Sequence, residues 1–220
     1  MQTVEAAIRN RYSCRAYQDR PVDRDIIDQI LQVAQHAPSW CNVQPWEVVI
    51  VSGQAARQFG EAYRQHAAET PPEPDFAWPP HYQDEHQLRR RECGLSLYQT
   101  LGIAKGDKAA TGHQMLENYR FFGAPHVALI TTPRYLGVYG AIDCGIYVAN
   151  FVMAAQSLGV ATIIQAALAS HPAFVRSHFN LPDNKAVVCG IAFGYEDAEA
   201  KINTFRTTRE TFDKVVRFID

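Results

Sequence analysis

Two short clusters in the first fifty residues carry side chains that suit a phosphorylated, ring-containing ligand. Residues 11–15 read RYSCR and place two guanidinium groups beside a hydroxyl. A guanidinium suits phosphate because its planar fork donates two parallel, charge-assisted hydrogen bonds. Residues 37–46 read APSWCNVQPW, in which Ser39, Asn42 and Gln44 can bond the polar edge of a flat heterocycle while prolines restrict the backbone. The clusters therefore predict a phosphate site and a ring site.

The elements that must position these clusters follow from hydrophobic periodicity and turn residues. Asp23 is the predicted N-cap of one helix and Pro38 its stop. Residues 214–219 are a candidate further strand of the sheet. Short strands scattered among helices, without regular βαβ alternation, indicate an α+β fold. Helices are predicted over residues 2–10, 23–37, 54–69, 83–104, 108–120 and 140–158, and strands over 46–51, 127–132, 161–164 and 186–193.

Two segments depart from the ordinary amphipathic pattern. Residues 140–158 are apolar on nearly every side, which predicts that this helix is buried in the core or in a subunit interface. Residues 70–82 are rich in proline and aromatic side chains, which break regular structure and predict a surface loop or lid. The segment is short for a linker, so the whole chain, residues 1–220, is expected to form a single domain.

Composition and charge exclude several classes of protein. The chain has 220 residues, 47% of them hydrophobic, which is enough for one domain with a substantial core. A net charge of −2 without a long run of one sign gives no indication of nucleic-acid or membrane binding. The five cysteines form no C-x-x-C pair and no secretory signal is recognised, which favours reduced thiols and a cytoplasmic location. The histidines lack zinc-site spacing, so no metal is expected.

Taken together, the two clusters resemble the N-terminal signature of the nitroreductase family of FMN-dependent oxidoreductases. That signature is R-x-S-x-R, then a helix, then A-P-S-x-x-N-x-Q-P-W leading into a strand, and every one of these letters is met here. The likeness covers nearly the whole chain and is weakest between residues 54 and 120. It implies a nitroreductase-like fold, with a central mixed, mostly antiparallel sheet flanked by helices, in an intertwined homodimer. The tail, residues 203–220, is available to pair with the partner subunit.

For the phosphate end of the flavin, the resemblance implies that Arg11 and Arg15 grip the phosphate or the ribityl chain. The family also carries a basic residue in the C-terminal tail that completes this site. By its spacing to the apolar segment that follows, Arg209 is the better match and Arg206 the second choice. With two neighbours that would lie close to the ring or chain, the implied positions are Arg11, Tyr12, Ser13, Arg15, Arg206 and Arg209.

For the flavin ring, the resemblance implies a loop that lies over the flavin of the other subunit, and backbone N–H groups placed at the N5 and O4 atoms. Such donors stabilise the negative charge of a reduced flavin. Trp40 departs from the family, because a second small residue is commoner there. Gln165 and Ala166 stand where many members have an acidic residue and glycine. The implied positions are Pro38, Ser39, Trp40, Asn42, Gln44, Ile163, Ile164, Gln165 and Ala166.

The activity implied is transfer of a hydride from NADH or NADPH to the flavin and then of electrons to a nitroaromatic or quinone acceptor, by ping-pong kinetics. The chain has neither G-x-G-x-x-G after a strand nor G-x-x-x-x-G-K-[ST], so the donor would stack on the resident flavin. The loop with its tryptophan is most similar to nitrobenzoate reductases. No side-chain general acid is needed, and the predicted substrate pocket consists of Trp40, Phe76, Trp78 and Arg120.

Other readings of the same residues remain open. Within flavin chemistry, the chain could be a reductive dehalogenase, an enone reductase or a flavin-fragmenting enzyme, and turnover on a panel of acceptors discriminates among them. A flavin-binding sensor would hold FMN but oxidise no NAD(P)H. An interaction module without flavin would require the whole N-terminal signature to be coincidence.

Overall fold

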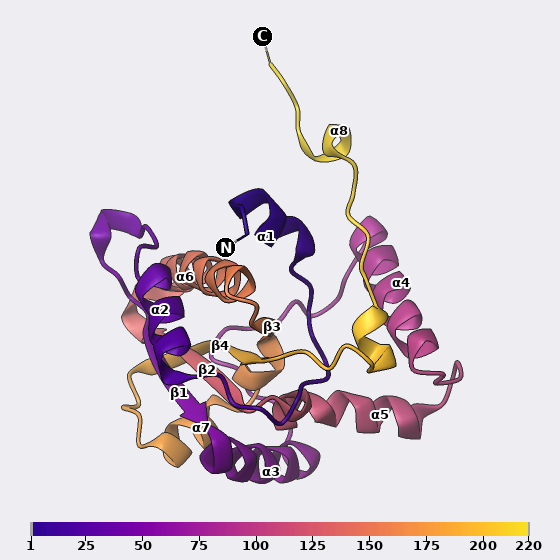
Figure 1. The fold of residues 1–220 in the computed structure, drawn as a ribbon, viewed down its shortest axis with the longest axis horizontal. Coiled ribbons are helices and arrows are strands. Elements are labelled where there is room, and N and C mark those ends of the chain that lie inside the picture. The colour runs from indigo at the N-terminus through magenta and orange to yellow at the C-terminus, as the bar shows by residue number, and fades with distance from the viewer. Residues whose placement is uncertain (1, 220) are drawn as a thin grey trace.

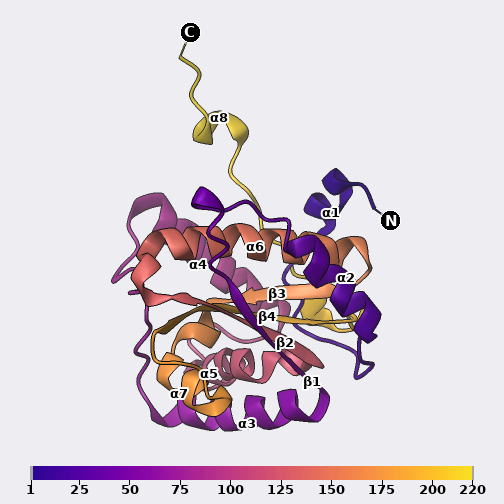
Figure 2. The same ribbon diagram turned by 90° about the vertical axis from the view of Figure 1, so that its left-hand side faces the viewer.

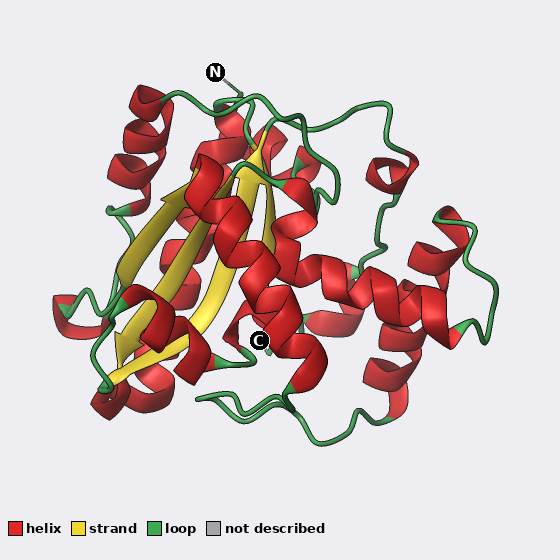
Figure 3. Ribbon diagram, turned by 90° about the horizontal axis from the view of Figure 1, so that it is seen from below, coloured by secondary structure: helices red, strands yellow, loops and turns green. Residues whose placement is uncertain are grey.

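Four strands form one sheet in the order β1-β2-β4-β3, and each pair of neighbours runs antiparallel. The computed structural model describes residues 2–219. In β2 every residue except Pro133 is buried, because both faces of the central strands are covered (Figure 3). A parallel bridge between Ser13 and Thr162 adds the only non-antiparallel pairing in the described chain. The strands are β1 (Glu47–Ser52), β2 (His126–Pro133), β3 (Ala161–Gln165) and β4 (Lys185–Gly194).

Helices cover both faces of this sheet, as the α+β prediction requires (Figure 2). Two apolar clusters result, one between the sheet, α2 and α6, and the other between the sheet, α3 and α7. On the first face lie α1 (Val4–Asn10), α2 (Arg24–Ala34) and α6 (Gly137–Ser157), and on the second α3 (Gly53–Glu69), α5 (Lys108–Leu116) and α7 (Pro172–Phe179). At the side of the molecule α4 (Asp84–Thr100) stands next to the C-terminal segment, which contains α8 (Phe212–Val215) (Figure 1).

Every predicted helix and the four principal strands are present, with several corrections. The predicted helix 23–37 ends at Ala34, before Pro38. The predicted helix 83–104 ends at Thr100. The predicted helix 108–120 ends at Leu116 and continues as a 3-10 segment, because Phe121 and Phe122 adopt left-handed φ angles of 60° and 54° and turn their rings into the core. Residues 214–219 do not extend the sheet: one turn of helix precedes an exposed segment that leaves the body of the molecule (Figure 1). Asp23 occupies the N-cap position of α2, but its side chain makes no capping bond.

The apolar helix α6 is buried on one side only. Its inner side packs against the sheet and α2 through residues such as Tyr147 and Phe151. Its outer side exposes Val138, Tyr139 and Ile142, whose exposed fractions are 63%, 56% and 53%. Residues 134–157 are long and apolar enough to cross a membrane, but half of that stretch is buried inside the domain, as in the core helix of a globular protein. The helix therefore has a core face and an unpartnered apolar face.

The irregular segment predicted over residues 70–82 is anchored to the domain at one buried carboxylate. The side chain of Asp75 is 5% exposed, and its oxygens lie 2.5 Å from Arg134 and 2.7 Å from Arg176. It also accepts a hydrogen bond of 2.9 Å from the backbone N–H of Val187 at the start of β4. The middle of the segment is thus tied to the sheet.

Replacing Asp75 with asparagine should lower the free energy of unfolding by about 2 kcal/mol, because the buried Arg176 loses its counter-charge while Arg134 can be hydrated. Chemical denaturation followed by circular dichroism measures this change. Asp183→Asn, an exposed change nearby in the fold, serves as the control and should alter the free energy by less than about 0.5 kcal/mol. Equal stability of the two variants would contradict the anchoring role.

Candidate functional site

Five arginines line one cavity of about 430 Å³, and four of them are those predicted for the phosphate end of a flavin. Arg11 and Arg15 come from the segment after α1, and Arg206 and Arg209 from the C-terminal segment. The other lining residues are Ile8, Arg9, Tyr12, Ser13, Phe205 and Thr207. The structure thus brings together all six residues predicted for the phosphate end of a flavin.

A buried amide holds these two segments together. Asn203 is 5% exposed, and its carbonyl oxygen accepts a hydrogen bond of 2.8 Å from the backbone N–H of Arg15. Its amide nitrogen donates to the carbonyls of Ala16 and Asp197 at 2.8 Å and 2.9 Å. Asn203 is not among the residues predicted for the site; its place three residues before Arg206 was the signal in the sequence.

Of the five arginines that line the cavity, Arg9 is paired with Glu5 at 2.8 Å, whereas the other four have no carboxylate partner among the described residues. Burial, and to a smaller extent the charge of Arg209, lower the pKa of the Arg11 guanidinium. Burial also lowers the pKa of Arg15, whose guanidinium lies 5.7 Å and 6.0 Å from the ring centres of Phe205 and Phe122. Within residues 2–219, none of the four arginines forms an ion pair with an acidic side chain. A cluster of partly buried like charges favours a bound anion, so these residues fit the phosphate of FMN.

The two tail arginines have different surroundings. The guanidinium of Arg206 lies 3.6 Å from the ring centre of Tyr12 and donates to the carbonyls of Asn203 and Phe205. Arg209 donates to the hydroxyl of Thr207 at 2.7 Å and to the carbonyl of Thr208 at 2.8 Å. The guanidinium of Arg206 is held in place by stacking on Tyr12 and by hydrogen bonds to backbone carbonyls. The positive charge of Arg209, in contrast, lowers the pKa of Arg11.

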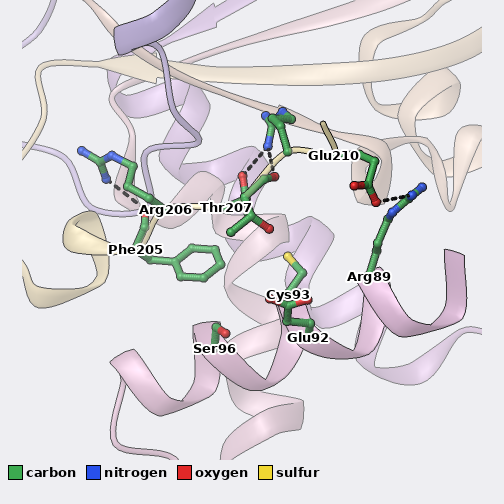
Figure 4. Close-up of a pocket in the computed structure, with 10 residues that line it drawn as sticks. Arg89, Glu92, Cys93, Ser96, Phe205, Arg206, Thr207 and Glu210 are labelled. Carbon is green, nitrogen blue, oxygen red and sulfur yellow. Dashed lines mark hydrogen bonds and ion pairs between the residues drawn. The ribbon is translucent and has the colours of Figure 1, made fainter. Parts of the chain in front are cut away.

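A second cavity of about 430 Å³ lies between the same tail and α4, as Figure 4 shows. Cys93 and Ser96 of α4 line it opposite Phe205, while Arg206 points away from the helix. Arg89 of α4 is paired with Glu210 of the tail at 2.8 Å. The arginine cavity therefore continues toward α4 through shared wall residues: Phe205, Arg206, Thr207 and Arg209.

The strand whose end is predicted to face the flavin ring, β3, begins beside the arginine segment. The backbone N–H of Cys14 donates to Thr162 at 3.0 Å, so this segment runs beside the strand. Three residues further along β3, about 10 Å away at strand spacing, Gln165 precedes a 3-10 turn that begins at Ala166. The first N–H groups of such a turn have no partner within it and are available to an acceptor.

Side chains at this strand end are held rigidly. Gln165 is 2% exposed and donates its amide to the carbonyl of Asn118 at 2.8 Å. Ile163 is buried, whereas Ile164 is 43% exposed and faces away from the core. The turn itself packs onto β4, where a Cβ atom on Gly190 would lie 2.4 Å from Leu168. This close approach fixes the position of the turn.

The loop that carries Pro38, Ser39 and Trp40 lies at the other end of α6. The backbone N–H of Trp40 lies 3.2 Å from both carboxylate oxygens of Asp143, in the first half of α6. Tyr12 instead shares a cavity with Gln156, near the C-terminal end of that helix. The thirteen residues between Asp143 and Gln156 span about 20 Å. Figure 2 shows the turn that leads into β1 above one end of α6 and α1 beside the other.

Two other predicted members of this loop support its turn. The backbone N–H of Gln44 donates to the hydroxyl of Ser39 at 2.9 Å, and its side-chain amide donates to the carbonyl of Asn42 at 3.1 Å. The indole of Trp40 is 62% exposed. Within one chain, the structure therefore assembles the phosphate cluster with β3 but leaves the loop cluster apart from them.

The residues predicted for the substrate pocket are dispersed. Phe76 is half-buried and Trp78 is 45% exposed, both in the segment anchored by Asp75. Arg120 pairs with Glu61 at 2.6 Å and with Glu117 at 3.6 Å, so its charge is already compensated. None of these three is among the described residues that line the arginine cavity.

Comparison with known proteins identifies the family of this chain. The sequence profile described as the Nitroreductase family matches residues 8–195. The chain belongs to the nitroreductase family. It is 34% identical over 225 residues to a 4-nitrobenzoate reductase of Nocardioides sp., covering 100% of this chain and 91% of that relative. It is also 34% identical to the nitroreductase NfnB of Mycolicibacterium smegmatis, covering 99% and 93% of the two chains.

Solved structures of family members extend the agreement to the whole fold. The crystal structure of the FMN-dependent nitroreductase NfnB from Mycobacterium smegmatis in complex with NADPH superposes with a TM-score of 0.94, at 34% identity and over 98% of this chain and 97% of that one. The FMN- and NADPH-dependent nitroreductase NfnB from sphigopyxis sp. strain HMH gives a TM-score of 0.93 at 33% identity over all of both chains. The nitroreductase-like fold expected from the sequence is thereby confirmed.

Proposed function

We propose that this protein is an FMN-dependent oxidoreductase that uses NADH or NADPH to reduce nitroaromatic or quinone-like acceptors. The observation that carries the proposal is the cavity beside β3 in which four of the five arginines have no acidic ion-pair partner among the described residues. Its full-length relatives include FMN- and NADPH-dependent nitroreductases and a 4-nitrobenzoate reductase, which favours NADPH as donor and nitroaromatics as acceptors.

The residues of this chain divide the work of binding. Arg11, Arg15 and Arg209 hold the phosphate, and Arg206 supports that cluster through Tyr12. The N–H groups that follow Gln165 are directed to the polar edge of the ring, where they stabilise negative charge. When bound, FMN supplies the redox chemistry, since it accepts a hydride from the nicotinamide and passes electrons to the acceptor. Donor and acceptor occupy the same space in turn, so the kinetics are ping-pong.

The active form is a homodimer in which the loop of residues 38–44 reaches the flavin of the partner subunit. Separation of the two clusters along α6 supports this arrangement, because about 20 Å of helix lies between Asp143, which contacts the loop, and Gln156, which shares a cavity with Tyr12. The exposed apolar residues Val138, Tyr139 and Ile142 supply an interface on α6. The tail, with Phe212 and Phe218 exposed, extends away from the body of the molecule, where it can pack against a partner subunit (Figure 1). We expect the enzyme in the cytoplasm.

An absorbance spectrum of the purified protein, followed by anaerobic addition of NADH or NADPH, tests the proposal. Flavin bands that bleach with one donor and return on addition of 4-nitrobenzoate would support it and identify the donor. A protein that neither retains nor rebinds FMN would overturn it. A flavoprotein that no nicotinamide donor reduces would instead be a flavin-binding sensor.

A further inference from the structure

Asp143 is a buried carboxylate on an otherwise apolar stretch of α6. It is 7% exposed, and both of its oxygens lie 3.2 Å from the backbone N–H of Trp40. Among residues 2–219, no lysine, arginine or histidine forms an ion pair with it. Burying an unpaired charge is costly, so a leucine would serve better if the helix had only to pack. The carboxylate is therefore explained by the turn that it holds.

That turn needs an external tie because its backbone is strained. Cys41, Asn42 and Gln44 have φ angles of 52°, 56° and 49°, in the left-handed region that side-chain-bearing residues rarely adopt. Strain of this kind persists only where the surroundings over-determine the conformation. Asp143 fixes the start of the turn, and the hydroxyl of Ser39 fixes its end through the N–H of Gln44.

The indole of Trp40 is positioned from the same helix. Its ring centre lies 4.7 Å from that of Tyr139, one helical turn before Asp143, and the planes are tilted by 58°. A small cavity of about 80 Å³ lies beside the two rings, also lined by Val43 and Leu136. The backbone bond and the ring contact together give the indole one orientation, while most of its surface stays free for another molecule.

We propose that Asp143 is a positioning residue that sets the orientation of the Trp40 indole against an aromatic acceptor bound over the flavin of the partner subunit. This inference rests on the proposed function, because it requires the flavin and the dimer. A carboxylate suits the task, since a charge-assisted bond to an N–H is roughly twice as strong as a neutral one. Selectivity for flat aromatic acceptors then depends on Asp143 through Trp40, although Asp143 touches neither flavin nor acceptor.

The test compares Asp143→Leu, which removes both acceptor oxygens, with Asp143→Asn, which keeps the volume and one of these oxygens. For Asp143→Leu we expect the KM for 4-nitrobenzoate to rise about tenfold. The rate with ferricyanide, which needs no stacking surface, and the Kd for FMN should stay within about twofold. Asp143→Asn should restore most of the KM. Amide hydrogen exchange of the peptide spanning residues 38–44 should speed up about tenfold in Asp143→Leu alone.

A double variant and the thermal midpoint separate positioning from a merely structural role. In a Trp40→Ala background, Asp143→Leu should add less than about twofold to the KM. The Tm of Asp143→Leu should not fall, because an apolar side chain replaces a buried charge. Asp28→Ala, on the exposed side of α2, is the control. Should Asp143→Leu not form a dimer, Asp143→Ala takes its place with the same expectations.

An unchanged KM and unchanged exchange in Asp143→Leu, with wild-type protein active, would overturn the inference. An additive effect in the Trp40→Ala background would also overturn it. Wild-type protein without FMN, or without NAD(P)H-dependent turnover, would instead reject the proposed function on which the inference rests.

Discussion

Replacing Arg11 and Arg209 together with alanine is expected to raise the Kd for FMN at least about a hundredfold. These two guanidinium groups line one cavity, and the charge of Arg209 helps to lower the pKa of Arg11. Two cations this close together are suited to bind the same anion. Each charge-assisted hydrogen bond to phosphate contributes about 1.5–3 kcal/mol, and about 1.4 kcal/mol corresponds to a tenfold change in Kd. Titration of the apoprotein with FMN, followed by flavin fluorescence, measures the effect.

The single variants refine this prediction. Arg209→Ala should weaken FMN binding more than Arg206→Ala, whose guanidinium is already stacked on Tyr12 and bonded to carbonyls. Arg24→Ala removes an exposed arginine paired with Asp28 and should leave the Kd unchanged. If the double variant binds FMN as tightly as the wild type, the arginine cavity is not the phosphate site.

Replacing Ile142 with glutamate is expected to dissociate the dimer and to lower NADPH-dependent turnover at least about a hundredfold. Ile142 is 53% exposed in the centre of the apolar face of α6. In a two-fold interface the same substitution occurs twice, so two carboxylates would be buried without partners. Loss of the dimer also removes the partner's loop from the flavin. Light scattering during gel filtration and steady-state kinetics measure the two effects.

The matched control for this prediction is Val33→Glu, because Val33 is similarly exposed, at 48%, on the neighbouring helix α2. It should leave both the mass in solution and the turnover close to those of the wild type. A dimeric, fully active Ile142→Glu variant would show that α6 does not form the interface.

Local patterns in the sequence were sufficient for most of the fold. Apolar runs and turn residues located the four main strands and all the larger helices, because the periodic spacing of buried side chains along an element can be read from that element's own residues. The pattern failed where distant contacts decide the backbone. The helix predicted to reach residue 120 ends early because Phe121 and Phe122 turn into a core made by other segments. Residues 214–219 have the composition of a strand, but none of the described strands pairs with them.

The residues of the candidate site could likewise be predicted from the sequence only in part. Arg11, Ser13 and Arg15 could be selected because their spacing is short and their chemistry is shared with a known family. Asn203 and Asp143 could not, since each acts through a backbone N–H far away in the sequence. The compensation of Arg120 by Glu61 and Glu117 likewise depends on how α3 packs against the segment after α5.

Among the described helices, α4 contributes to the site without contributing to the core. None of its residues is buried, although Cys93 and Ser96 form one wall of the cavity next to the phosphate cluster. Substitutions of the exposed side chains of α4 therefore carry a small folding penalty, whereas truncation of a core side chain of α6 such as Phe151 would cost about 3–5 kcal/mol. The residues that form the core and the residues of α4 that line this cavity therefore belong to different elements, so the sequence of α4 can change while the core sequence is kept. New acceptor preferences can arise on α4 at little risk to the rest of the enzyme.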